Sequence, residues 1–226
     1  FDLIYNRPNQ SVNMWVNELQ KAIKIAKNHL SVYQLTIEPG TPFYLLLARG
    51  ALKLPNEDIS AALYEITQEI LSDAGMEAYE ISNHASPGEA CRHNLVYWQY
   101  GDYIGIGPGA HGRVTVNGRI YATRQHRAPE IWLRRVEENG HATQTYQSLD
   151  RNSVINEMII MGLRISKGID AQNFLSRTGI NLKNVIDQEA SRRLQKGGFI
   201  IHDNSKLLAT YSGRQRLDSV ISSLIN

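Results

Sequence analysis

The polar and aromatic residues between positions 80 and 98 are the part of this sequence best suited to bind a ligand. Glu80–His84 reads EISNH and is followed by Cys91–Trp98, which reads CRHNLVYW. A neutral imidazole such as that of His93 is a good iron ligand, flat aromatic rings offer a stacking surface, and Arg92 or Arg113 could hold carboxylates. The segment therefore indicates a site for a planar ligand or a metal ion. The alternative is a structural loop in which His93 bonds a backbone carbonyl group.

A glycine-rich stretch follows at residues 104–112, with glycine at 105, 107, 109 and 112. Its backbone amides could face an anionic ligand. The spacing matches neither nucleotide-binding fingerprint, because it lacks the Lys-Ser/Thr pair and the longer GxGxxG register. Close approach of the backbone to a neighbouring element explains the glycines equally well, so both interpretations stay open.

Two charged features also allow more than one interpretation. Asp2 places a carboxylate in an apolar strand segment, where a buried charge needs a partner. Either it points into the lumen of a barrel and binds a hydroxyl or an amine, or it is exposed. Arg192, Arg193 and Lys196 suggest a DNA-reading helix, but three cations on one helix usually form a solvated face.

The elements that must position these residues alternate between strands and helices. We expect strands at 1–5, 30–37 and 76–81, with helices at 11–27 and 56–74 between them. This order implies right-handed crossovers and a parallel sheet with its helices outside. The loops after the strands, at 6–10, 38–42 and 82–103, would carry the chemistry. The prediction is an α/β fold that forms half of a partial (β/α) barrel with parallel strands.

The pattern changes after residue 103. Residues 114–121 form a hairpin signal around Asn117-Gly118, and a helix runs from Pro129 to Gly140. The polar stretch 141–150 lacks periodicity, so we divide the chain into domains 1–145 and 146–226. The second domain shows helical patterns at 150–163, 170–179, 182–194 and 212–224 and a hairpin at 199–210, which predict a small helical, winged-helix-like module.

Composition narrows the class of protein. The 226 residues include 24 Lys and Arg against 22 Asp and Glu, a net charge of +2 that argues against a dedicated nucleic-acid binder. The lone Cys91 excludes a disulfide or a Cys-only metal site within one chain and fits a reducing compartment. No apolar run approaches the roughly 20 residues of a membrane span. We expect a cytoplasmic protein, and the start at Phe1 without Met suggests a longer parent.

Several motifs, taken together, resemble one family. They are DLIY at 2–5 with P-x-Q at 8–10, YQLTIEPGTP at 33–42, YEISN at 79–83, HNLVYW at 93–98 and GxGxGAHG at 105–112. This combination resembles the HemW branch of the radical S-adenosylmethionine proteins, also described as oxygen-independent coproporphyrinogen III oxidase-like. The likeness extends from Asp2 through the C-terminal module.

The resemblance implies a heme chaperone that binds heme and hands it to acceptor hemoproteins, with S-adenosylmethionine and a [4Fe-4S] cluster as cofactors. The cluster motif of the family, Cys-x3-Cys-x2-Cys, is absent, so this chain alone should not cleave S-adenosylmethionine. An alternative is an oxygen-independent coproporphyrinogen III oxidase. Another, from a different class, is a protein- or nucleic-acid-docking module. Half a barrel would also leave an exposed strand edge, through which a homo-oligomer could form.

The resemblance assigns roles to particular residues. Those expected near S-adenosylmethionine are Asp2, Tyr33, Thr36, Ile104 and Ile106. Those expected at heme are His93, as the axial ligand to the iron, with Tyr97 and Trp98 as the wall of the site. The sequence departs from the family at Asn6 and Asn9, where glycine is usual. Either the turn takes another form there, or both asparagines adopt left-handed conformations.

Overall fold

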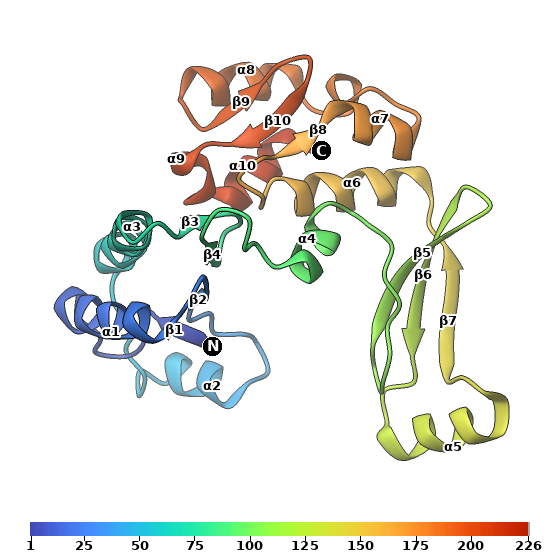
Figure 1. Ribbon diagram of the computed structural model, residues 1–226, viewed down its shortest axis with the longest axis horizontal. Coiled ribbons are helices and arrows are strands. Elements are labelled where there is room, and N and C mark those ends of the chain that lie inside the picture. Colours follow the sequence, from blue (N-terminus) through green and yellow to red (C-terminus); the bar gives the residue numbers. More distant parts are fainter. Residues whose placement is uncertain (226) are drawn as a thin grey trace. The chain divides into compact units, whose positions relative to one another are not determined.

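The computed structural model describes residues 1–225, which form two compact units, Phe1–Cys91 and the chain from Arg92 onward (Figure 1). Both units combine helices with sheets, which confirms the α/β class. The division at Cys91 differs from the boundary that we expected at residue 146. None of the described helices is both long and apolar enough to cross a membrane.

The first unit begins with the expected alternation of strands and helices. Its elements are β1 (Asp2–Tyr5), α1 (Val12–Ile25), β2 (His29–Gln34), α2 (Pro42–Ala48), α3 (Glu57–Asp73), β3 (Glu77–Ala78) and β4 (Asn83–Ala85). The sheet order is β1-β2-β4-β3, and β1 runs parallel to β2. The predicted β1-α1-β2 crossover is therefore confirmed.

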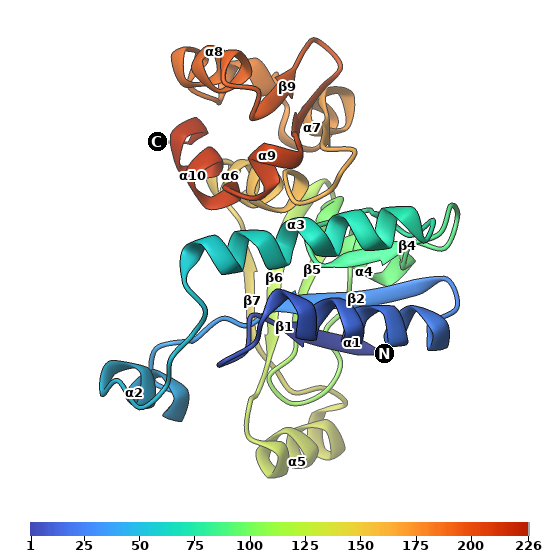
Figure 2. The same cartoon turned by 90° about the vertical axis from the view of Figure 1, so that its left-hand side faces the viewer.

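One face of β1 and β2 is buried beneath α1 and α3 (Figure 2). Tyr5, Leu30 and Val32 point to this face and pack in one core with the buried side chains of the two helices. The Trp15 indole donates a hydrogen bond of 2.7 Å to Thr67 Oγ1, which satisfies its polar N–H inside the core. This core fixes the face that each strand residue presents.

The prediction of a third parallel strand at 76–81 is wrong. β3 is short, and the chain turns back so that β4 pairs antiparallel with both β2 and β3. The cause is the buried Glu80, whose Oε1 accepts hydrogen bonds from the Ser82 amide at 2.7 Å and from Asn83 Nδ2 at 2.6 Å. These bonds stabilise a turn where the apolar pattern indicated extended chain.

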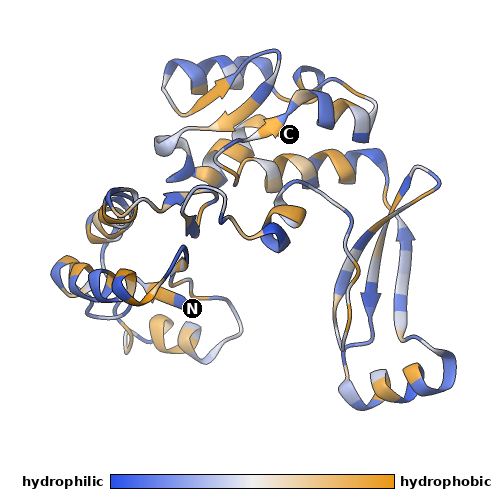
Figure 3. Cartoon of the chain, in the orientation of Figure 1, coloured by the Kyte–Doolittle hydropathy of each residue, from blue (hydrophilic) through white to orange (hydrophobic). Residues whose placement is uncertain are grey.

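Helix α2 lies between residues 37 and 56, where the sequence predicted neither a strand nor a helix. Thr41 caps it by accepting a hydrogen bond from the Tyr44 amide, and Pro42 occupies its first turn. Hydrophobic colour runs along much of α2 in Figure 3, where residues 43–47 are consecutive apolar and aromatic residues. Their side chains are all exposed, and none of the residues of α2 is buried. Helical periodicity cannot reveal such a helix, because it has no polar face.

The second unit contains two three-stranded antiparallel sheets. Its elements are α4 (Arg92–Trp98), β5 (His111–Val116), β6 (Arg119–Gln125), α5 (Pro129–Asn139), β7 (Thr143–Ser148), α6 (Arg151–Gly162), β8 (Ile169–Asp170), α7 (Ala171–Thr178), a 3₁₀ turn (Leu182–Asn184), α8 (Gln188–Lys196), β9 (Ile200–His202), β10 (Lys206–Ala209), α9 (Tyr211–Arg214) and α10 (Leu217–Leu224). The sheet orders are β5-β6-β7 and β8-β10-β9.

The first of these sheets contains the predicted hairpin and one strand that we did not expect. Asn117 and Gly118 have φ values of 49° and 75°, the left-handed pair that a two-residue hairpin turn requires. Residues 143–148, which we expected to be an unstructured boundary, form β7 and pair with β6. Thr, Gln and Tyr populate β7, so it lacks the apolar alternation on which the prediction depended.

The C-terminal part follows the predicted order with two corrections. Asp150 and Asp170 cap α6 and α7 as expected. The helix expected at 182–194 is instead a 3₁₀ turn and α8, because Asp187 accepts a hydrogen bond from the Ala190 amide and starts a new helix. The helix expected at 212–224 is likewise divided into α9, capped by Thr210, and α10.

Candidate functional site

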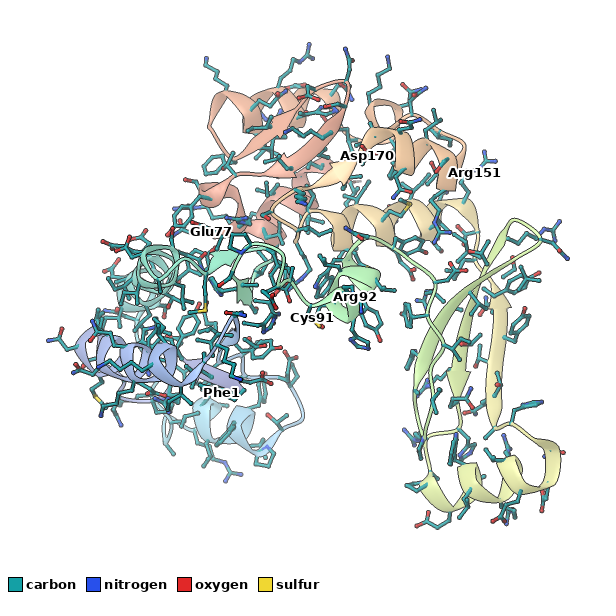
Figure 4. The ribbon with its side chains drawn as sticks, in the orientation of Figure 1. Phe1, Glu77, Cys91, Arg92, Arg151 and Asp170 are labelled. Atoms are coloured by element: carbon teal, nitrogen blue, oxygen red, sulfur yellow. The ribbon has the colours of Figure 1, made fainter. Side chains whose placement is uncertain are left out.

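His93, Tyr97 and Tyr103 form an aromatic cluster at α4. His93 and Tyr97 are one helical turn apart, and the Tyr97 hydroxyl lies 3.1 Å from His93 Nε2. Their rings meet edge-on at 4.9 Å between centroids, and the ring of Tyr103 lies 4.4 Å from that of Tyr97. His93 is exposed at the surface of the unit. Figure 4 marks Arg92, where this helix begins.

Trp98 does not belong to this cluster, although it follows Tyr97 in sequence. Successive residues of a helix point about 100° apart, so Trp98 faces another side of α4. Its ring lies beneath the Arg164 guanidinium, 4.6 Å from the carbon at the centre of that group. Trp98 also lines a hollow of about 570 Å³ with Met158 and Ile165 of the C-terminal part. The structure thus brings together His93 and Tyr97 and turns Trp98 away from them.

Arg113, Glu157 and Tyr100 form a polar network that is joined to Tyr103 of the aromatic cluster. Arg113 pairs with Tyr103 through two backbone hydrogen bonds of 2.7 and 2.9 Å. Its guanidinium holds Glu157 of α6 in a bidentate ion pair, with Nη2–Oε1 at 2.7 Å and Nε–Oε2 at 3.0 Å. The Tyr100 hydroxyl donates to the same carboxylate at 2.7 Å. Arg113, which we considered as a ligand for external carboxylates, is therefore occupied by an internal one.

The network shifts the pKa values of its members. Burial raises the pKa of Tyr100, and the hydrogen bond to Glu157 raises it further. Burial opposes ionisation of Glu157, but the hydrogen bonds from Arg113 and Tyr100 outweigh it and hold the pKa of this carboxyl below its usual value. Burial likewise raises the pKa of Tyr103. Tyr100 and Glu157 are separated by 57 residues, so no local motif connected them.

Asp2 and Tyr33 lie on the same face of the first sheet. Asp2 is opposite Ser31 and Ile4 is opposite Tyr33 in the parallel pair, and paired residues of neighbouring strands point to one side. This side is the one that α1 and α3 leave open, and Asp2, Ile4 and Tyr33 are exposed there. Thr36 is also exposed but follows the end of β2, where its hydroxyl donates weakly to the Gln34 carbonyl at 3.4 Å.

Ile104 and Ile106 belong to the other unit and are 76% and 85% exposed, unusually open for large apolar side chains. The glycines around them serve close backbone packing. A Cβ at Gly105 would lie 2.4 Å from the His111 carbonyl oxygen, and one at Gly112 would lie 2.4 Å from Thr123 Oγ1. The packing interpretation of the glycine run therefore holds at these two positions.

Asn6 and Asn9 adopt left-handed backbone conformations, with φ values of 62° and 59°. Of the two alternatives given for these positions, the left-handed conformation is the one that the structure has. Asn6 also gains a contact that glycine cannot make, because its Oδ1 accepts a hydrogen bond of 2.8 Å from Ser60 of α3. Asparagine therefore adopts the left-handed conformation at both positions of the turn after β1.

Comparison with known proteins finds relatives that match most of this chain. The chain is 35% identical over 99% of its length to radical S-adenosyl methionine domain-containing protein 1, mitochondrial, of Mus musculus, and covers 52% of that protein. It is 34% identical over 87% of its length to the heme chaperone HemW of Escherichia coli, of which it covers 50%. Over most of its length the chain is similar to HemW-related radical SAM proteins. It spans about half the length of these relatives.

Two further comparisons concern the C-terminal part of this chain and its fold. Residues 149–216 match the family model of the HemN C-terminal domain, which covers α6 to α9. The structure resembles that of coproporphyrinogen III oxidase (HemN) from Escherichia coli with a TM-score of 0.72, over 98% of this chain and 53% of that one. The identity in that match is 18%, so it bears on the fold.

The cofactors of the family differ in how well this chain suits them. The exposed imidazole of His93 fits an axial iron ligand, and the open face with Asp2 and Tyr33 fits a polar ligand such as S-adenosylmethionine. An iron–sulfur cluster does not fit, because the sequence holds one cysteine. Within residues 1–225, no three His, Cys, Asp or Glu side chains gather as metal ligands.

Proposed function

We propose that this chain is part of a heme chaperone that binds heme and delivers it to acceptor hemoproteins. One observation carries the proposal: in a chain that is 34% identical to a heme chaperone, an exposed histidine packs against a tyrosine ring that in turn packs against a second tyrosine ring. An exposed imidazole can reach the iron of an incoming porphyrin, and the neighbouring rings offer edges for apolar contact.

His93 is proposed as the axial ligand and Tyr97 as its neighbour in the wall of the site, with Tyr103 added from the structure. Nε2 of His93 is engaged by the Tyr97 hydroxyl, so ligation through this atom requires that hydrogen bond to break. Trp98 is proposed to contribute to the wall of the heme site on another side of α4 than Tyr97, because its ring packs against Arg164 and away from His93.

S-adenosylmethionine is proposed to bind the open face of the first sheet. Asp2 would accept hydrogen bonds from its hydroxyl or amino groups, and Tyr33 and Thr36 would line the neighbouring strand end. Ile104 and Ile106, whose exposure suits contact with a flat apolar ring, are proposed for the adenine. A [4Fe-4S] cluster would come from the part of the parent that supplies the cysteines.

The parallel pair β1-β2 with α1 and α3 on one face supports the half-barrel interpretation of the first unit. The antiparallel sheet β8-β10-β9 among short helices supports a winged-helix-like module.

β1 has a neighbouring strand on one side within the described residues, so we propose that a homo-oligomer forms through this edge. Light scattering over a range of concentrations tests this, and a monomer throughout would contradict it.

A heme titration of the full chain tests the role of His93. The His93→Ala variant should weaken heme binding about tenfold and shift the Soret band, since a metal–imidazole bond is lost. His141→Ala removes another exposed histidine and is the control. If His93→Ala binds heme with unchanged affinity and spectrum, His93 is not the ligand.

A test of the reaction distinguishes the chaperone from an oxidase. Incubation of the reconstituted parent with coproporphyrinogen III should leave this compound unchanged, and formation of vinyl groups would identify an oxidase instead.

We propose a reducing compartment, the cytoplasm, on the basis of the single cysteine. The mouse relative is named as mitochondrial, so fractionation of cells should compare both locations.

A further inference from the structure

A hollow of about 560 Å³ lies at one end of the sheet β5-β6-β7, and none of the site residues assigned above lines it. It is lined by Arg124, His126, Arg127, Ala128, Gln144 and Thr145. All six come from the end of β6, the start of β7 and the segment that leads into α5. Three of them carry guanidinium or imidazole groups, and none is a carboxylate.

Strand pairing and backbone hydrogen bonds hold the chain segments that carry these side chains. Arg124 is opposite both His111 of β5 and Thr145 of β7, and an irregularity in the pairing follows it at Gln125. The next residue, His126, is held on two sides, because its amide donates to Ala142 and its carbonyl accepts from Gly109, each at 2.9 Å. The hollow is thus built on paired strands and backbone bonds.

The hydrogen-bonding capacity of the hollow consists largely of donors. His126 Nδ1 accepts a bond of 3.2 Å from the Ala128 amide, so in the neutral ring the proton sits on Nε2, which can donate. Ala128 is the N-cap of the 11-residue helix α5 and offers no side chain to cap it. Pro129 has no N–H, so the uncapped first turn of α5 offers the backbone amides of Glu130 and Ile131 as further donors next to Ala128 in sequence.

The two arginines of the hollow have no internal counter-charge. Within residues 1–225, neither Arg124 nor Arg127 makes a side-chain hydrogen bond or an ion pair. The first acidic residue of α5, Glu130, does not line the hollow. This contrasts with Arg113, whose guanidinium in the same sheet is held by Glu157. Two like charges at one hollow repel each other, and a bound anion would offset that repulsion.

We propose that this hollow binds a small ligand that carries a doubly charged oxyanion, either a phosphate group or a pair of carboxylates. Planar guanidinium groups pair with both kinds of anion in a bidentate manner, and Gln144 and Thr145 can supply further polar contacts. The site is separate from the proposed heme ligand His93 and does not depend on the chaperone function.

The test is a titration of the full chain with inorganic pyrophosphate, inorganic phosphate and succinate, followed by backbone amide NMR at low ionic strength. We expect saturable shifts of residues 124–128, 144 and 145. Arg124→Gln and Arg127→Gln should each weaken binding about tenfold. Arg134→Gln, which removes the same charge from an exposed position of α5 outside the hollow, should change it by less than about twofold.

The probes distinguish the source of the anion. Tighter binding of pyrophosphate and phosphate than of succinate identifies a phosphate site, and the reverse order identifies a carboxylate site. Absence of saturation with all three probes overturns the proposal, as does an equal loss in the Arg134→Gln control. Thermal unfolding of each variant checks that the exposed substitutions leave the fold intact.

Discussion

The hydroxyl of Tyr97 lies 3.1 Å from Nε2 of His93, one turn along α4. This bond occupies the nitrogen that the proposed heme site requires. Tyr97→Phe removes the bond and should strengthen heme binding by about three- to tenfold, because one neutral hydrogen bond no longer has to break. Heme titration at the Soret band measures the change. Tyr103→Phe, which keeps the ring edge-on to Tyr97, is the control, and weaker binding by Tyr97→Phe would show that the hydroxyl contacts the ligand.

Glu157 is expected to make the stability of the second unit depend on pH. Its pKa is lowered in the folded state, so its contribution is complete above the ordinary value of 4.5 and is lost as the pH falls through the folded value. Glu157→Gln should reduce the free energy of unfolding by about 2 kcal/mol at pH 7 and by much less in acid. Urea denaturation at several pH values measures this difference. Glu189→Gln breaks an exposed pair with Arg193 and should cost about 0.5 kcal/mol or less at any pH.

Thr67 is expected to be essential to the core of the first unit. Its hydroxyl accepts from the Trp15 indole at 2.7 Å and donates to the Leu63 carbonyl at 2.6 Å, and all three residues are buried. Thr67→Val keeps the shape but leaves the indole N–H unsatisfied, which should cost about 1–3 kcal/mol. Thr67→Ser retains the hydroxyl and should cost less. Equal losses in chemical denaturation would show that packing, not hydrogen bonding, decides the effect.

Asn9 tests the left-handed turn after β1. It is exposed, and its φ of 59° suits glycine or asparagine better than alanine. Asn9→Ala should lower the free energy of unfolding by about 1 kcal/mol, whereas Asn9→Gly should change it by about 0.5 kcal/mol or less. Thermal unfolding of the two variants side by side provides the comparison. If alanine were tolerated as well as glycine, the turn would have to change shape in solution.

The sequence predicts the elements that have a clear periodicity or a strong local signal. The β1-α1-β2 crossover, the Asn117-Gly118 turn and the caps at Asp150 and Asp170 are confirmed. These features depend on residues close together in the chain. The turn at Glu80 could not be predicted, because it depends on a buried carboxylate inside an apolar run.

The candidate site shows the same limit. The motif around His93 indicated a ligand site, and the helix that carries it sets His93 beside Tyr97 but turns Trp98 toward Arg164. A motif that is read as a string does not show which residues share a face until its helix is recognised. The Arg113–Glu157 pair joins residues 44 positions apart, and no spacing rule connects them.

Cys91 is the last residue of the first unit and the only cysteine in the sequence. Its thiol is free and partly accessible. A single maleimide-linked spin label or fluorophore can therefore be attached at the junction of the two units without removing any other reactive thiol. Paired with a second label at the exposed Asn117-Gly118 turn, it would measure distances across the chain by spectroscopy and follow how they respond to heme or S-adenosylmethionine.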